Sequence, residues 1–163
     1  MATHQMRDTR AGAAGAMSIE QLVPRLREAY GDGLRCVLVY GSAADPGAGA
    51  EAAARTSRDV NVLVLVDALE LDALRRAGGV MRDWVGAGHP SPLTLTTGEW
   101  RSSADVFAIE YADVLERHRV LHGALPTDGI QVRPEDIRRE LEEQVLGALL
   151  KLRRGIMEAG GAA

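Results

Sequence analysis

The sequence has only one cysteine, Cys36, and one lysine, Lys151, among its 163 residues. A lone cysteine cannot form a disulfide within the chain, which favours a reducing compartment, the cytoplasm. The sequence also lacks the run of about 18 apolar residues that a membrane-spanning helix requires, and it shows no secretory signal. Because the net charge is −4, we expect no general attraction to nucleic acid or to an anionic membrane.

The remaining composition is typical of a folded protein, with 46% hydrophobic and 26% charged residues. This length is sufficient for one compact domain with a sizeable core. Residues 1–17 have neither an apolar run nor a periodic pattern, so we expect a disordered tail there. The pattern assigns residues 18–125 to the folded domain and residues 134–158 to a helix that packs on this domain or on a partner.

The hydrophobic patterns predict an α/β (α+β) domain with a small, mixed, twisted sheet and packed helices. Apolar runs predict strands at 34–40, 59–67 and 93–97, and the alternation of side chains that begins near Phe107 extends the strand prediction over 105–123. Helical spacing occurs at 22–30, where Ser18 and Gln21 can form a capping box and Pro24 favours a regular helix that begins there. A second helix is expected at 69–85, with these residues facing inward: Leu71, Leu74, Val80, Met81 and Trp84.

The long helix predicted at 134–158 has favourable residues at both ends. Pro134 suits the first helical position, Asp136 suits the positive end of the helix dipole, and Lys151 suits the negative end. One stripe of this helix is apolar and contains Ile137, Leu141, Val145, Ala148, Leu149, Leu152 and Ile156. Such a stripe forms part of a core or packs against a partner, either another protein or a second copy of the chain.

Polar residues stand at the ends of two predicted strands. Gly41 allows the backbone to approach a ligand closely, and the hydroxyl of Ser42 with neighbouring amides can bind phosphate. Asp59 and Asn61 are two residues apart, so their side chains leave the same face of a strand. Acids at such positions, with a carboxylate from a neighbouring strand, form an oxygen ligand set for Mg²⁺, which stabilises the reacting oxygens in nucleotidyl transfer.

This arrangement of a hydrophobic strand, Gly-Ser, a spacer and an acidic strand start resembles the fingerprint of the nucleotidyltransferase superfamily, which has the polymerase-beta-like fold. Gly41 and Ser42 match the Gly-Ser pair and Asp59 matches the first metal-binding aspartate, but Asn61 stands where the second aspartate is found. The third carboxylate lies on a later strand, and Glu110 is the residue that fits it. Over roughly residues 20–158, the chain is similar to a bacterial group of nucleotidyltransferase-like proteins without a settled activity. The segments that carry this similarity are VLVYGSAA, SRDVNVLVLV, PLTLTTGEW, DVFAIEYADVLERHRVLHG and ELEEQVLGALLKLR.

The resemblance implies a catalytic pair, a Mg²⁺ site and a nucleotide site. By this resemblance, the catalytic pair is Asp59 and Glu110, and the Mg²⁺ ligands are Asp59, Asn61 and Glu110. The nucleotide site consists of Gly41, Ser42, Ser57 and Arg58. The asparagine weakens the implication, because a carboxamide has one neutral oxygen and cannot bridge two cations as a carboxylate does. We therefore expect at most one ion, held weakly without nucleotide, and a site in which catalysis is crippled or absent while nucleotide–Mg²⁺ binding survives.

Ordinary structural roles are alternatives for the same residues. The Gly-Ser pair would then be a strand-ending turn, Asp59 a cap on loop amides, and Asn61 a hydrogen-bonding residue. A buried Glu110 requires either a metal or a cation such as the arginine before Asp59. His118 and His122 have metal-binding spacing only on a helix, so on a predicted strand we interpret them as surface or core histidines.

Three functions remain open from the sequence. The first is a degenerate nucleotidyltransferase-like domain that binds a nucleoside triphosphate with Mg²⁺ and acts through a protein partner. The second is an active enzyme that moves a nucleoside monophosphate to a small molecule or a protein. The third is a non-catalytic, antitoxin-like interaction module that uses the long helix as its interface.

Overall fold

The described part of the chain forms a four-stranded sheet whose strands are arranged in the order β3-β2-β1-β4. The computed structural model describes residues 17–44 and 60–160. Strand β1 (Leu34–Tyr40) runs antiparallel to its neighbours β2 (Asn61–Val66) and β4 (His118–Gly123). Strand β3 (Leu93–Thr96) runs parallel to β2. The sheet is therefore mixed, and the predicted α/β fold class is confirmed.

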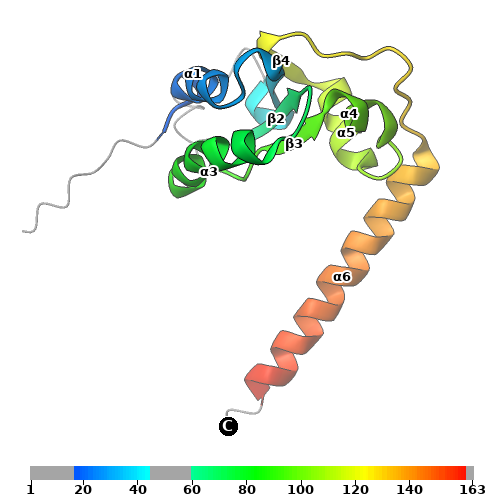
Figure 1. Cartoon of the computed structure of the whole chain (residues 1–163). Coiled ribbons are helices and arrows are strands. Elements are labelled where there is room, and N and C mark those ends of the chain that lie inside the picture. The colour runs from blue at the N-terminus through cyan, green and yellow to red at the C-terminus, as the bar shows by residue number, and fades with distance from the viewer. Residues whose placement is uncertain (1–16, 45–59, 161–163) are drawn as a thin grey trace, which may run out of the picture.

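Helices cover both faces of the sheet (Figure 1). Helices α1 (Ile19–Tyr30) and α3 (Leu71–Gly86) pack on one face, and α4 (Thr97–Ser102) and α5 (Ala108–Glu116) pack on the other. Because side chains alternate along a strand, β1 and β2 contribute to two apolar clusters. The cluster under α1 and α3 includes Val37, Val39, Val62, Val64 and Val66, and the cluster under α4 and α5 includes Cys36, Leu38, Leu63 and Leu65.

Two buried tryptophans anchor the helices on their respective faces. Trp84 of α3 donates its indole N–H to the carbonyl oxygen of Pro90 at 2.9 Å, and Trp100 of α4 donates to that of Pro126 at 2.7 Å. The ring of Trp100 stacks on Tyr111 of α5, with ring centroids 4.0 Å apart. Each indole thus combines a large apolar contact with a satisfied polar group, and it fixes α3 to the loop that follows it and α4 to the segment after β4.

The strand prediction for 105–123 is correct only in its last third. Residues Ala108–Glu116 form α5, and β4 begins at His118. The buried residues Ala108, Tyr111 and Val114 are spaced three apart, which places them on one side of a helix. Small alanines between the larger side chains produced an apparent alternation that fits either structure, and packing of Tyr111 on Trp100 favours the helix.

Two details of the other helices also differ from the prediction. Helix α1 begins at Ile19, before Pro24, and Ser18 forms the predicted capping box, with its N–H donating to Gln21 Oε1 at 3.1 Å. Burial of the apolar side of α1 offsets the one backbone hydrogen bond that Pro24 cannot donate. In α3, Val80 and Trp84 are buried as predicted and Met81 is half-buried, whereas Leu71 and Leu74 are exposed and Ala73 and Ala77 take the remaining inward positions.

The last helix, α6 (Pro134–Gly160), extends away from the sheet and its covering helices (Figure 1). It contacts the domain through α5, and of its residues only Asp136 is buried. The apolar residues from Leu141 onward are exposed, so the predicted stripe is not part of the core of this chain. No helix within the described ranges is long and apolar enough to cross a membrane.

Candidate functional site

The Gly-Ser pair forms a sharp corner at the end of β1. Residues Gly41–Ala44 make one short 3-10 turn (η2), and Gly41 has a φ of 71°, a conformation that favours glycine. The N–H of Gly41 donates to the carbonyl oxygen of Arg117 at 3.1 Å. This amide is therefore engaged within the chain, whereas Ser42 is exposed beside it. Of the predicted phosphate-binding groups at this corner, the hydroxyl of Ser42 is the accessible one.

Asn61 lies directly against this corner. It is the first residue of β2 and is paired with Tyr40, the last residue of β1. A Cβ atom added to Gly41 would lie 3.7 Å from Asn61 Nδ2. By strand alternation, Asn61 shares the face of Leu63 and Leu65, which is the face covered by α4 and α5. The predicted residues Ser57, Arg58 and Asp59 lie outside the described residues.

Glu110 is on helix α5 rather than on a strand, which corrects the prediction for the third carboxylate. The helix nevertheless brings it to the same face and the same end of the sheet as Asn61, because both are neighbours of Tyr40. Burial raises the pKa of Tyr40 to about 12, and the nearby charges of Glu110 and Asp113 add to this effect. The fold therefore assembles Gly41, Asn61 and Glu110 around the end of β1.

The carboxyl group of Glu110 has an unusual environment. Its Oε2 atom is buried and has no hydrogen-bond partner among the described residues. Burial raises the pKa of Glu110, while a backbone hydrogen bond lowers it. Two neighbouring acids, Glu140 of α6 and Asp113, raise this pKa further. Burial of the Oε2 atom close to other carboxylates disfavours the charged form, so this side chain favours the protonated form or a cation.

Glu140 is a neighbour that the sequence did not reveal. Its Oε2 accepts a hydrogen bond from the backbone N–H of Ile109 at 2.9 Å, at the start of α5. It thereby joins α6 to α5 and places a second acid beside Glu110. In the sequence, Glu140 is one of several acids in the first half of a long helix, and only the tertiary contact distinguishes it.

The described residues contain no group of three or more His, Cys, Asp or Glu side chains that could hold a metal ion. Asn61 and Glu110 offer oxygen donors of the kind that Mg²⁺ prefers, and the unpartnered oxygen of Glu110 fits a cation. A complete ligand set would also need Asp59. His118 and His122 lie on β4, as predicted, and His118 Nδ1 lies 2.7 Å from the carbonyl oxygen of Val114.

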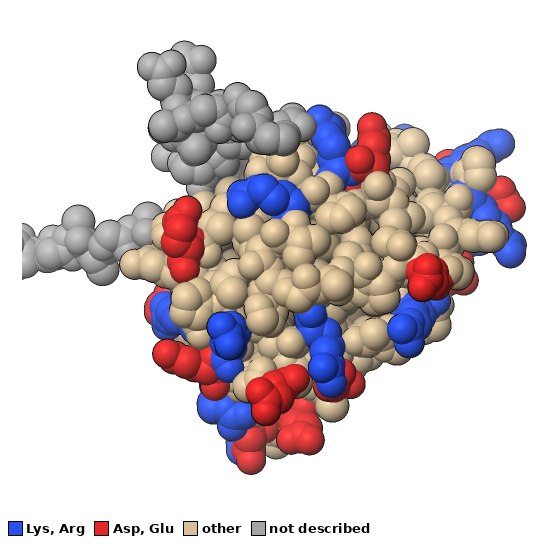
Figure 2. All heavy atoms as spheres, turned by 90° about the horizontal axis from the view of Figure 1, so that it is seen from above, with Lys and Arg blue, Asp and Glu red and all other residues tan. Residues whose placement is uncertain are grey.

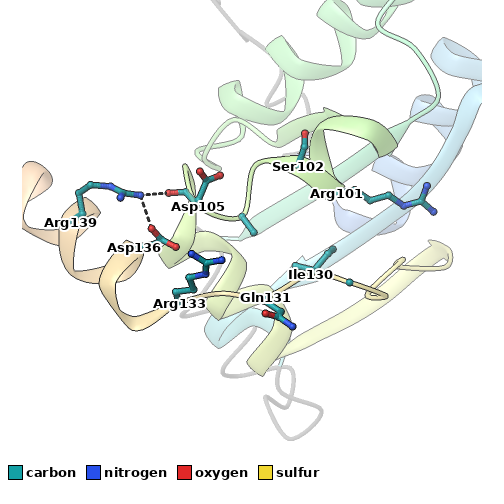
Figure 3. A pocket seen from close by; sticks show the side chains of 10 residues that line it. Arg101, Ser102, Asp105, Ile130, Gln131, Arg133, Asp136 and Arg139 are labelled. Carbon is teal, nitrogen blue, oxygen red and sulfur yellow. Dashed lines mark hydrogen bonds and ion pairs between the residues drawn. The ribbon is translucent and has the colours of Figure 1, made fainter.

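A separate cavity of about 540 Å³ lies where α6 joins the domain (Figure 3). Arg139 of α6 bridges Asp136 Oδ1 at 2.7 Å and the carbonyl oxygen of Asp105 at 2.9 Å, while Arg133 and Arg101 line the same cavity. None of the residues predicted for the site lines this cavity. The bridge by Arg139 fixes the first turn of α6 to the loop before α5.

The face of the molecule in Figure 2 has basic and acidic residues interspersed over its described part. No continuous basic area is present on the described part of that face, whereas proteins that bind nucleic acid through phosphates concentrate lysine and arginine on one surface.

No protein family model matches the chain, and no curated protein matches it. Among solved structures, a chain from the toxin–antitoxin complex with AMP-PNP is similar over 90% of this chain and 100% of its own length, with 14% identity and a TM-score of 0.40. A chain from the tri-AMPylated Shewanella oneidensis HEPN toxin in complex with MNT antitoxin is similar over 88% of this chain and 95% of its own, with 15% identity and a TM-score of 0.39. A chain from a mutant of the toxin–antitoxin MntA-HpeT gives 15% identity and a TM-score of 0.38, over 90% of this chain and 100% of its own length. These likenesses are remote and carry no argument about ligands or activity.

Proposed function

We propose that the chain is a degenerate nucleotidyltransferase-like domain that binds a nucleoside triphosphate with Mg²⁺, does not transfer the nucleotide efficiently, and acts through a protein partner. The observation that carries this proposal is the position of Asn61, a neutral carboxamide that packs directly on the Gly41 corner. A carboxylate at this place would supply both charge and a bridging ligand, and the carboxamide supplies neither.

The ligands proposed for the single ion are Asp59, Asn61 and Glu110. Bound Mg²⁺ would neutralise phosphate charge, and the chain's own groups would position the nucleotide at the end of β1. Ser42 would donate its exposed hydroxyl to a phosphate oxygen, and Ser57 and Arg58 are the further phosphate contacts. A cation beside Glu110 would offset the burial, and the charge of the neighbouring Glu140, that together raise the pKa of its carboxyl group.

Nucleotide binding is tested by the melting temperature of the full chain with and without ATP or GTP and Mg²⁺, because selective binding to the native state must stabilise it. We expect an increase that requires both components and that is lost in Asp59→Asn. Asp67→Asn is the matched control, because Asp67 follows the other end of β2 and pairs with Arg35. An unchanged melting temperature would refute nucleotide binding.

The loss of catalysis is tested by transfer of a labelled nucleotide, with the chain itself and a small-molecule mixture as acceptors. We expect little or no Mg²⁺-dependent transfer by the native chain. Asn61→Asp should bind Mg²⁺ more tightly, because it restores the missing charge. Efficient transfer by the native chain that is abolished by Asp59→Ala would instead establish an active enzyme.

The exposed apolar surface of α6 supports a second, compatible function as an interaction module. Leu152 and Ile156 are 61% and 63% exposed, and leucines and valines precede them along the same helix. A helix with such a surface gains stability when another protein covers it. If nucleotide binding fails its test while α6 binds a partner, the interaction function alone would remain.

A further inference from the structure

Six apolar residues of α6 lie along one side of the helix and define a seam, whereas Leu146, Leu150 and Met157 lie on another side. Four of the six, Leu141, Val145, Ala148 and Leu152, follow the four-three-four spacing of a coiled-coil interface. Leu149 and Ile156 widen the seam on one side. All of the large residues of this set are exposed, from 39% for Leu149 to 63% for Ile156. The seam therefore needs a helical surface of matching pattern to cover it.

We infer that this seam pairs with the same seam of a second copy of the chain, with the two α6 helices antiparallel and a two-fold axis beside Gly147. This inference rests on the part of the proposed function that gives α6 a protein partner, and it is independent of nucleotide binding. With that axis, Leu141 of each copy lies opposite Leu152 of the other, and Val145 lies opposite Ala148. The small Ala148 allows close approach of the two helices near the axis.

The distribution of charge along α6 favours this antiparallel arrangement. Residues 134–146 contain five carboxylates and two arginines, a formal charge of −3, while residues 147–160 contain three basic residues and one acid, a formal charge of +2. An antiparallel second copy places each acidic half beside a basic half, and it also opposes the two helix dipoles. A parallel copy would place like charges together.

The polar residues on either edge of the seam fit the same antiparallel register. Glu142 and Arg153 are eleven residues apart, which places both on one edge of the seam at about 100° per residue. In the antiparallel pair, Glu142 of one copy lies near Arg153 of the other. On the opposite edge, Gln144 lies near Lys151 of the second copy. These flanking contacts specify the partner and the direction of the helices.

The attachment of α6 to the domain leaves the seam open. Two residues join α6 to the domain by hydrogen bonds: Arg139 donates to the carbonyl oxygen of Asp105, and Glu140 accepts from the backbone N–H of Ile109. At about 100° per residue, Glu140 lies roughly a third of a turn, and Arg139 roughly two fifths of a turn, away from the line of Leu141 and Leu152. A second helix can therefore cover the seam without displacing α5.

The mass of the full chain in solution, measured by light scattering over a range of concentrations, tests the pairing. We expect a dimer, and we expect Val145→Asp to raise its dissociation constant at least about tenfold, because it places two unpaired carboxylates in the seam. Leu150→Asp is the matched control, since Leu150 is similarly exposed, at 53% against 59% for Val145, but lies on another side of the helix. A monomeric native chain, or equal loss of pairing in both variants, would overturn the inference.

Charge exchange tests the antiparallel direction. Glu142→Arg and Arg153→Glu should each weaken the dimer, and the double variant should restore it, because the exchanged charges then meet across the interface. Within one helix these residues are about 16 Å apart and do not contact each other. A double variant no better than the worse single variant would refute this register. A monomeric chain that nucleotide nevertheless stabilises would refute self-pairing while leaving the nucleotide site in place.

Discussion

Gly123, the last residue of β4, provides the sharpest test of how the edge of the sheet is built. It pairs with Cys36 of β1 and has a φ of 71°. A Cβ atom on this residue would lie 1.8 Å from the carbonyl oxygen of Arg35 and 2.9 Å from its carbonyl carbon. Backbone atoms cannot rotate away as a flexible side chain can, so Gly123→Ala must shift β4 relative to β1.

Two costs determine the expected magnitude. The left-handed backbone conformation costs an alanine about 1–2 kcal/mol, and relief of the overlap by backbone movement costs about a further 1–3 kcal/mol. The smaller conformational entropy of alanine in the unfolded chain offsets roughly 0.4–1 kcal/mol of this. We therefore expect Gly123→Ala to lower the free energy of unfolding by about 1–4.5 kcal/mol, a substantial part of the stability of a typical domain.

Gly129→Ala is the matched control, because Gly129 has a similar φ of 77° but no atom within 4 Å of an added Cβ. It should suffer only the conformational cost. Urea unfolding followed by the fluorescence of the two buried tryptophans measures both variants. Equal destabilisation by the two substitutions would refute the reasoning, because it would show that the contact with Arg35 contributes nothing.

Three further predictions concern single side chains. Because the pKa of Glu110 is raised above its ordinary value of 4.5 in the folded chain, the native state binds more protons than the unfolded state between these two values, and stability falls as the pH rises through that interval. Glu110→Gln should therefore raise the melting temperature at neutral pH and flatten the decrease that begins above about pH 4.5; a lower melting temperature would contradict this. Tyr111→Phe removes the buried hydrogen bond from the Tyr111 hydroxyl to the carbonyl oxygen of Trp100 at 2.8 Å, and should cost about 1–2 kcal/mol in urea unfolding. Arg35→Ala breaks an exposed ion pair with Asp67, and should change the free energy of unfolding by less than about 1 kcal/mol, with a smaller effect at high salt.

The sheet and most of the helices could be predicted because their signals are local. The apolar runs that became β1 and β2, the capping box of Ser18 and Gln21, and Pro134 at the start of α6 all depend on residues a few positions apart. Segment 105–123 could not be predicted in full, because its small alanines fit two periodicities. Packing of Tyr111 on Trp100, a contact between different elements, determines the helix.

The candidate site was predictable only in part for the same reason. Proximity of Gly41 and Asn61 follows from adjacent antiparallel strands, so the strand pattern was sufficient to anticipate it. The environment of Glu110 depends on Glu140, thirty residues further along the chain, and on the way α6 meets α5. No pattern within either segment predicts the contact between α6 and α5. The expectation that Glu110 pairs with an arginine or a metal followed from its burial alone.

The way α6 is attached makes it a lever arm. Its fixed contacts lie in the first two turns, and the remaining twenty or so residues extend for roughly 30 Å at 1.5 Å per residue. A rotation of about 10° at the fixed end therefore displaces the far end by about 5 Å. Glu110 and Glu140 meet at that fixed end, so a small shift of α6 at this contact would become a several-fold larger displacement at the tip of the helix.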